Sequence, residues 1–263
     1  MDYIQSNKAA WEDGFEHRKT AWGEDDHIRL RSKKLAFFHA DMRKELETID
    51  FQGKTVAHFC CNNGRELLSL TDLGICAAVG FDIAENIIGQ ANEAAAKAGI
   101  KNCEFVACNI LDIPEDYHGK FDLILITVGA ICWFDDLGLF FEKVAKCLKA
   151  DGRLIMHEIH PFENMLPVPG DEGFDPENLN QFAFSYFRKD PWIDTGMGYM
   201  SGEYVSTKTF TSFSHTLSEI INGLSANGLK TVRFHEYDYD IADLTDVYDG
   251  KGLPLSFILL AEK

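Results

Sequence analysis

Short runs of hydrophobic residues recur along the first part of the chain, and amphipathic stretches separate them. The almost wholly apolar run 121–127 (FDLILIT) is typical of a strand that is covered on both faces of a sheet. Further strands are predicted at 55–60, 77–81, 103–107 and 153–159, and helices at 65–72, 84–98 and 134–149. Strands that alternate with helices at this spacing predict a parallel sheet with right-handed crossovers.

The two ends of this pattern are less regular. Residues 1–26 are polar with scattered aromatics and predict a loose arm or short helices, whereas apolar residues at steps of three and four predict one amphipathic helix over 28–49. Residues 160–214 hold several prolines, many aromatics and short alternating pieces at 182–187 and 199–210. Regularity returns in a helix at 216–227 and strands at 230–237 and 255–262.

These segments divide the chain into two regions. Residues 1–49 form an N-terminal arm and helix that we expect to cover the site, and residues 50–263 form one α/β domain. The irregular stretch 160–214 is an insertion in that domain, and a loop of this length usually serves as a lid or a substrate wall.

Aromatic side chains mark the arm and the insertion. Since so many aromatics must bury somewhere, we expect them to shape a pocket beside the exit of the fifth strand, although a satellite hydrophobic cluster under a long loop is the alternative. The residues predicted to bind substrate in this pocket are Trp11 and Trp22 of the arm and Tyr199 and Tyr204 of the insertion.

Composition narrows the class of partner. The formal net charge of −17 repels a phosphate backbone and disfavours nucleic acids as partners. No apolar run approaches the ~20 residues of a membrane span, and the first residues lack an apolar signal core, so no membrane partner and a cytoplasmic location are expected. The seven cysteines include no C-x-x-C and predict reduced thiols.

The stretch 55–83 carries the most specific chemistry. It predicts a strand, a tight turn of small residues with Gly64, a short helix, and a second strand closed by Asp82. A turn of small residues lets backbone amides approach a ligand, and a carboxylate at the neighbouring strand end can accept both hydroxyls of a ribose. Asp82 could instead cap the helix that starts near Glu85.

The order of these motifs resembles class I S-adenosylmethionine-dependent methyltransferases over residues 50–262. The resemblance implies a Rossmann-like, doubly wound, mostly parallel seven-stranded sheet with an antiparallel last strand and an aromatic-rich insertion after the fifth strand. The family's first turn usually reads as an acid followed by G-x-G-x-G. His58, Cys60, Asn62 and Gly64 stand at those positions here.

Other landmarks extend the resemblance. GFDIAENII matches the end of the family's second strand, which implies that Asp82 and Ile83 contact the cofactor. CNILDIP matches the adenine loop, with Asn109 and Ile110, although Asn109 could be an ordinary turn residue. The fourth-strand tip brings Thr127 and then Trp133 to the same site, where Trp133 stacks on adenine or simply packs. S-adenosylmethionine is the cofactor that this resemblance implies.

The sequence HEIH at 157–160 suggests a metal site at first sight. On a strand only Glu158 and His160 share a face, and two ligands make no site, so no metal is predicted. Methyl transfer needs alignment of the reactants and, for a protonated nucleophile, a general base. His160 is the first candidate for that base and His215 the second.

The expected partners are a small-molecule methyl acceptor and, optionally, a second copy of the chain in a homodimer. Two other functions stay open. A non-catalytic protein of the same fold could bind S-adenosylmethionine or S-adenosylhomocysteine without turnover, as the altered turn suggests. A nicotinamide-dependent oxidoreductase would share the ribose-binding acid but needs a G-x-G-x-x-G turn, where CCNNGRE supplies one glycine.

Overall fold

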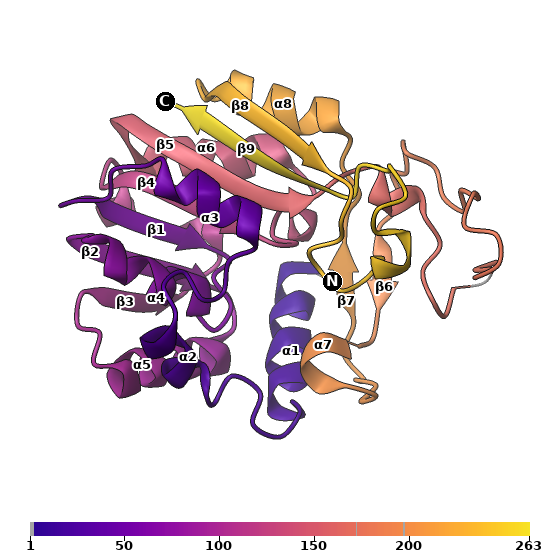
Figure 1. The fold of residues 1–263 in the computed structure, drawn as a ribbon, viewed down its shortest axis with the longest axis horizontal. Coiled ribbons are helices and arrows are strands. Elements are labelled where there is room, and N and C mark those ends of the chain that lie inside the picture. Colours follow the sequence, from indigo (N-terminus) through magenta and orange to yellow (C-terminus); the bar gives the residue numbers. More distant parts are fainter. Residues whose placement is uncertain (1–2, 172, 197) are drawn as a thin grey trace.

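A seven-stranded sheet forms the centre of the protein, as seen in a computed structural model that describes residues 3–171, 173–196 and 198–263 (Figure 1). The strands lie in the order β3-β2-β1-β4-β5-β9-β8, and β9 is antiparallel to both of its neighbours. The strands are β1 (Thr55–Phe59), β2 (Ala77–Asp82), β3 (Cys103–Ala107), β4 (Phe121–Thr127), β5 (Leu148–Ile159), β8 (Lys230–Tyr237) and β9 (Ser256–Glu262). The predicted fold class is confirmed.

Helices cover both faces of the sheet, which explains the near-continuous apolar sequence of β4. Leu123 and Leu125 face one hydrophobic cluster, and Ile124 and Ile126 face the other. The first cluster includes α3 (Ala40–Glu47), α4 (Arg65–Leu70) and α5 (Glu85–Ala98). The second includes α6 (Leu137–Cys147) and α8 (Leu217–Ala226).

The single helix predicted over 28–49 is wrong. The segment forms α2 (Asp26–Ser32) and α3, separated by an irregular stretch. Leu35 has a left-handed backbone with φ +51°, which no helix accommodates. His39 then starts α3 as its N-cap and accepts a hydrogen bond from Asp41 N. The apolar residues Leu35, Met42 and Leu46 are buried as the spacing suggests. They do not belong to one helix, because Leu35 lies in the irregular stretch and the other two lie in α3.

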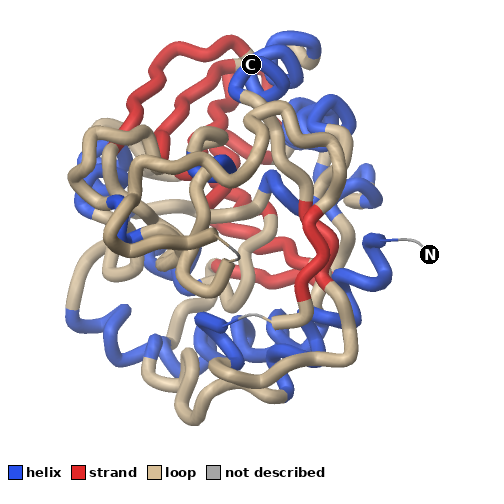
Figure 2. The backbone as a smooth tube through the Cα atoms, turned by 90° about the vertical axis from the view of Figure 1, so that its right-hand side faces the viewer, coloured by secondary structure: helices blue, strands red, loops and turns tan. Residues whose placement is uncertain are grey.

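The arm and the insertion lie together beside the carboxyl ends of the strands (Figures 1 and 2). The arm forms an ordered 14-residue helix, α1 (Tyr3–Glu16), rather than loose chain. The insertion contains α7 (Gly198–Ser201) and a two-stranded ribbon of β6 (Trp192–Asp194) and β7 (Phe210–Ser212). Figure 2 shows that most of the rest is loop. The alternating sequence pieces at 182–187 and 199–210 are mostly loop, apart from the helical turn α7 and the first residue of β7.

Within the described residues, no helix combines the length and apolar character needed to cross a membrane.

Candidate active site

The turn after β1 keeps an unusual backbone with unusual residues. Cys60, Asn62 and Gly64 all have positive φ, at +55°, +50° and +73°. Asparagine tolerates this region better than most residues, whereas cysteine pays a steric cost. Gly64 is required for a second reason, because a Cβ there would lie 2.2 Å from Cε1 of Phe105 on β3.

Asp82 connects this turn to the end of β2. Its Oδ2 accepts a hydrogen bond from Asn62 N at 2.8 Å, and its Oδ1 accepts one from Ala84 N at 3.1 Å. Burial raises the pKa of Asp82, while these backbone donors act in the opposite direction. The carboxylate therefore organises both the turn and the start of α5, in addition to any ligand that it binds.

His58 occupies the position of the family's acid. It is buried, its Nε2 lies 2.8 Å from Thr127 Oγ1 on β4, and its Nδ1 has no hydrogen-bond partner. Burial lowers the pKa of His58 to about 4, so the ring is neutral near pH 7. The strands thus bring His58 and Thr127 together, and the role of each toward the cofactor stays a prediction.

The segment after β3 forms a short capped turn. Asn109 Oδ1 accepts a hydrogen bond from Leu111 N at 3.1 Å, and Asn109 Nδ2 donates to Asp112 Oδ2 at 2.8 Å. Ile110 is buried in the α6 side of the core, whereas Ile83 is partly exposed after β2. Asn109 therefore has a structural role as a turn residue, and its contact with adenine stays a prediction.

Aromatic side chains from the arm, the insertion and the turn after β4 meet beside these loops. Trp11 of α1 packs edge-on against Trp133, which follows β4, and against Phe210 of β7, with both pairs of ring centroids 5.4 Å apart. The ring centroid of Tyr199 on α7 lies 6.5 Å from that of Trp11 and 6.3 Å from that of Trp22. We call Trp11, Trp22, Trp133, Tyr199 and Phe210 the aromatic cluster.

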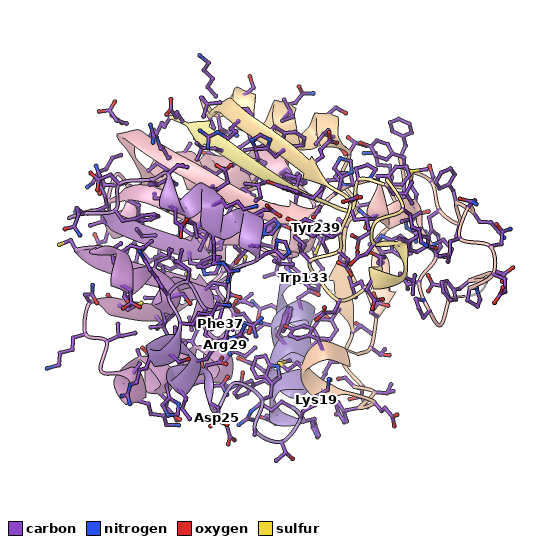
Figure 3. All side chains as sticks on the ribbon, in the orientation of Figure 1. Lys19, Asp25, Arg29, Phe37, Trp133 and Tyr239 are labelled. Carbon is purple, nitrogen blue, oxygen red and sulfur yellow. The ribbon has the colours of Figure 1, made fainter. Side chains whose placement is uncertain are left out.

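The aromatic cluster touches the turn after β1. The Tyr199 hydroxyl accepts a hydrogen bond from Asn62 Nδ2 at 3.1 Å. Figure 3 labels Trp133 at the upper end of α1, and Phe37 and Arg29 on the side of α2. The arm, the insertion and the turn after β1 therefore border one region, which is the arrangement that a wall over the site requires.

Tyr204 is the predicted acceptor-binding residue that the structure places elsewhere. Its ring stacks on His17 with centroids 3.8 Å apart, and its hydroxyl donates to Asp13 Oδ2 at 3.0 Å. Both partners belong to α1 or its end. Tyr204 thus fastens the insertion to the arm, and its contact with an acceptor stays a prediction.

The two candidate general bases lie in different surroundings. His160 Nδ1 accepts a hydrogen bond from Phe162 N at 3.0 Å, and Nε2 lies 3.0 Å from Glu236 Oε1 on β8. His215 lines a cavity of about 40 Å³ at the ends of β4 and β5. Its Nε2 lies 2.8 Å from Phe134 O, which places a proton on that nitrogen because a carbonyl can only accept.

Glu158 is a residue of this region whose importance the sequence did not reveal. It is 1% exposed at the end of β5 and lines the same cavity as His215. Its carboxylate accepts hydrogen bonds from Gly129 N and Ala130 N at 2.8 Å and from Ile131 N at 3.3 Å. Burial raises the pKa of Glu158 to about 7, against the effect of these donors. Its place at the carboxyl end of a parallel strand was the available signal.

A larger cavity of about 390 Å³ lies on the outer side of α5, beside Phe15, Arg18 and Gly23. None of the described residues predicted to bind the cofactor lines it. Across the described part of the chain, no group of three or more His, Cys, Asp or Glu side chains is arranged to hold a metal ion.

Comparison of the sequence with known protein families gives a match. Residues 50–182, about half of the chain, match the family model described as a methyltransferase domain. The demethylmenaquinone methyltransferase of Lactococcus lactis is 27% identical over 136 residues, which cover 46% of this chain and 53% of that protein. The chain thus matches about half the length of this curated relative.

Solved structures agree on the fold. An S-adenosylmethionine-dependent methyltransferase from Listeria monocytogenes has a TM-score of 0.64 and 18% identity, covering 84% of this chain and 96% of that one. The geranyl diphosphate C-methyltransferase of Streptomyces coelicolor, solved with Mg²⁺, geranyl diphosphate and S-adenosylhomocysteine, has a TM-score of 0.61 and 13% identity, covering 100% and 98%.

Proposed function

The chain belongs to the methyltransferase-domain family, whose cofactor is S-adenosylmethionine, and we propose that it transfers the cofactor's methyl group to a small-molecule acceptor. The observation that carries this proposal is the backbone of 60–64. Three residues at alternate positions have a left-handed backbone, although only one of them is glycine, and the middle one, Asn62, donates its backbone N–H to the Asp82 carboxylate. A left-handed backbone at these positions supports a turn that brings backbone amides close to the cofactor, as the resemblance implies for residues 60–64.

The residues around this turn fit the cofactor. A carboxylate has about four lone-pair positions, and the backbone N–H groups bonded to Asp82 leave acceptor capacity for ribose hydroxyls. The buried Nδ1 of the neutral His58 has no hydrogen-bond partner and is a further polar group beside the turn. Asn109, Ile110 and Trp133 would border the adenine.

When bound, the cofactor supplies an electrophilic methyl group on a sulfonium. The chain's own contribution is to hold an acceptor in line with that methyl group and to exclude water. The aromatic cluster suits both tasks, since its rings come from the arm, the insertion and the core loops. For an acceptor that must lose a proton, Nδ1 of His215 is the base we favour, because His215 lines the cavity and His160 is turned toward β8.

The same surroundings favour a flat, largely apolar acceptor. Tryptophan and tyrosine faces pack well against ring systems, and the curated relative is named for a demethylmenaquinone acceptor. The net charge of −17 continues to disfavour nucleic acids.

Calorimetry with S-adenosylhomocysteine tests the proposal through Asp82→Ala. We expect affinity to fall about tenfold or more, because each lost charge-assisted hydrogen bond is worth roughly 1.5–3 kcal/mol. Stability should fall as well, since the N–H groups of Asn62 and Ala84 lose their acceptor. Binding is therefore compared at a temperature where circular dichroism shows both proteins folded.

Asp116→Ala is the matched control, since it removes the same charge from an exposed site after β3. Equal affinities of the two variants would refute the Asp82 assignment. Binding of NADH in place of S-adenosylhomocysteine would favour an oxidoreductase, and binding without turnover of any offered acceptor would favour a non-catalytic protein.

A further inference from the structure

The buried carboxylate of Glu158 bonds to backbone rather than to a cation. Gly129 N donates to Oε2, and Ala130 N and Ile131 N donate to Oε1. The end of β5 is thereby tied to the turn that leaves β4. Gly129 has φ +73°, a backbone conformation that glycine adopts readily and most other residues do not.

The same turn supports the aromatic cluster. Trp133 N donates to Ala130 O at 3.3 Å, which makes the position of Trp133 depend on the residue that Glu158 binds. Trp133 in turn packs on Trp11 of α1 and lies 6.0 Å from Phe210 of β7. Cys132 O accepts a hydrogen bond from Phe213 N at 2.8 Å, just after β7.

We propose that Glu158 is the positioning residue of the site: by holding the backbone of 129–131 it sets Trp133, and through Trp133 and Cys132 it seats α1 and β7 over the cofactor turn. The importance of this role for methyl transfer rests on the proposed function. We call the three hydrogen bonds from the backbone of 129–131 to Glu158 the clamp, and this part of the proposal depends only on those contacts. Glutamine cannot replace it, because an amide has one accepting atom and its nitrogen would face N–H donors.

An ordinary buried carboxylate would also stabilise the fold, so the test needs a readout that stability alone does not move. Trp11 and Trp133 are close enough for coupled circular dichroism, and the part of the spectrum that Trp133→Phe removes reports their geometry. Glu158→Gln should lose that signal in the folded protein. It should also weaken S-adenosylhomocysteine binding about tenfold, because the residues around the ligand are then no longer held in place. A tenfold loss is about what the loss of one charge-assisted hydrogen bond would cause.

Asp122→Asn is the matched control. Asp122 accepts from Thr55 N, Thr55 Oγ1 and Lys149 Nζ near the start of β4, far along the strand from Trp133. This variant should lose stability and keep both the coupled signal and the affinity. If Glu158→Gln behaves like Asp122→Asn, Glu158 is not a positioning residue.

Ala130→Pro is a second test of the same hydrogen bonds, for use if the Glu158 variant does not fold. Ala130 has φ −83°, close to the range that proline fixes, and the substitution removes the Ala130 N–H donor without altering Glu158. It should also lose the coupled signal, and an unchanged spectrum would overturn the proposal. The spectra need no ligand, so failure of the wild-type protein to bind S-adenosylhomocysteine would refute the proposed function while the spectra still decide the clamp.

Discussion

At the scale of single residues, the turn after β1 has a left-handed backbone at three positions, of which only Gly64 is a glycine. Asn62 compensates for its left-handed backbone by accepting from Asn63 N at 2.8 Å and donating to Tyr199. Cys60 makes no comparable side-chain hydrogen bond among the described contacts, and it packs against the hydrophobic cluster on the α6 side of the sheet. Gly64 is different, because space rather than conformation alone excludes a side chain there.

We therefore predict that Gly64→Ala is much more costly than a left-handed alanine elsewhere. The strained backbone costs about 1–2 kcal/mol, and contact with the Phe105 ring adds about 1–3 kcal/mol of overpacking. Urea unfolding measures the difference. Gly119→Ala is the control, since Gly119 has φ +65° and a Cβ added there would meet no atom within 4 Å. Equal losses in the two variants would mean that Phe105 simply moves aside.

At the scale of elements, the α/β units follow directly from local sequence. Local sequence predicts the strands at 103–107 and 121–127 and the helix before Gly99. The apolar pattern that identifies each of these elements lies within its own residues. The break at Leu35 was not predictable, since the apolar spacing continues across it. The bonds of Glu158 and the aromatic cluster join segments far apart in the chain, which no local pattern records.

The contact between α1 and β7 gives the prediction at this scale. Asn7 is 4% exposed, donates to Thr211 O at 2.8 Å and accepts from Thr211 N at 2.7 Å. Asn7→Ala leaves both backbone groups without partners, at about 1–3 kcal/mol each. Hydrogen exchange should accelerate at 3–16 and 210–212, and S-adenosylhomocysteine should slow it if these segments cover the site.

The control for this prediction is Asn92→Ala, which removes an exposed asparagine that bonds within α5. Its exchange at 3–16 and 210–212 should match that of the wild-type protein. Unchanged exchange in Asn7→Ala would show that the aromatic contacts alone hold α1.

At the scale of the whole molecule, we expect buried titratable groups to make the free energy of unfolding depend on pH. Burial lowers the pKa of His157 to about 3 and that of His58 to about 4. Glu163 acts in the opposite direction, because burial raises its pKa to about 9. Its neutral form stabilises the fold at low pH, and this contribution is lost as pH rises above the unfolded value. The two histidines therefore lower the free energy of unfolding on the acid side, and Glu163 lowers it as the pH rises.

The histidines give the final prediction. An unfolded chain protonates both rings below about pH 6.5, whereas the folded chain keeps them neutral until pH 4 or 3. Stability should therefore fall as pH drops from 6.5, by up to about 3 kcal/mol for His58 and somewhat more for His157. His157→Leu should flatten this acid limb of a plot of unfolding free energy against pH. His235→Asn, at a side chain that is 51% exposed, should leave it unchanged. An acid limb of equal slope in His157→Leu would mean that carboxylates rather than buried imidazoles cause the loss.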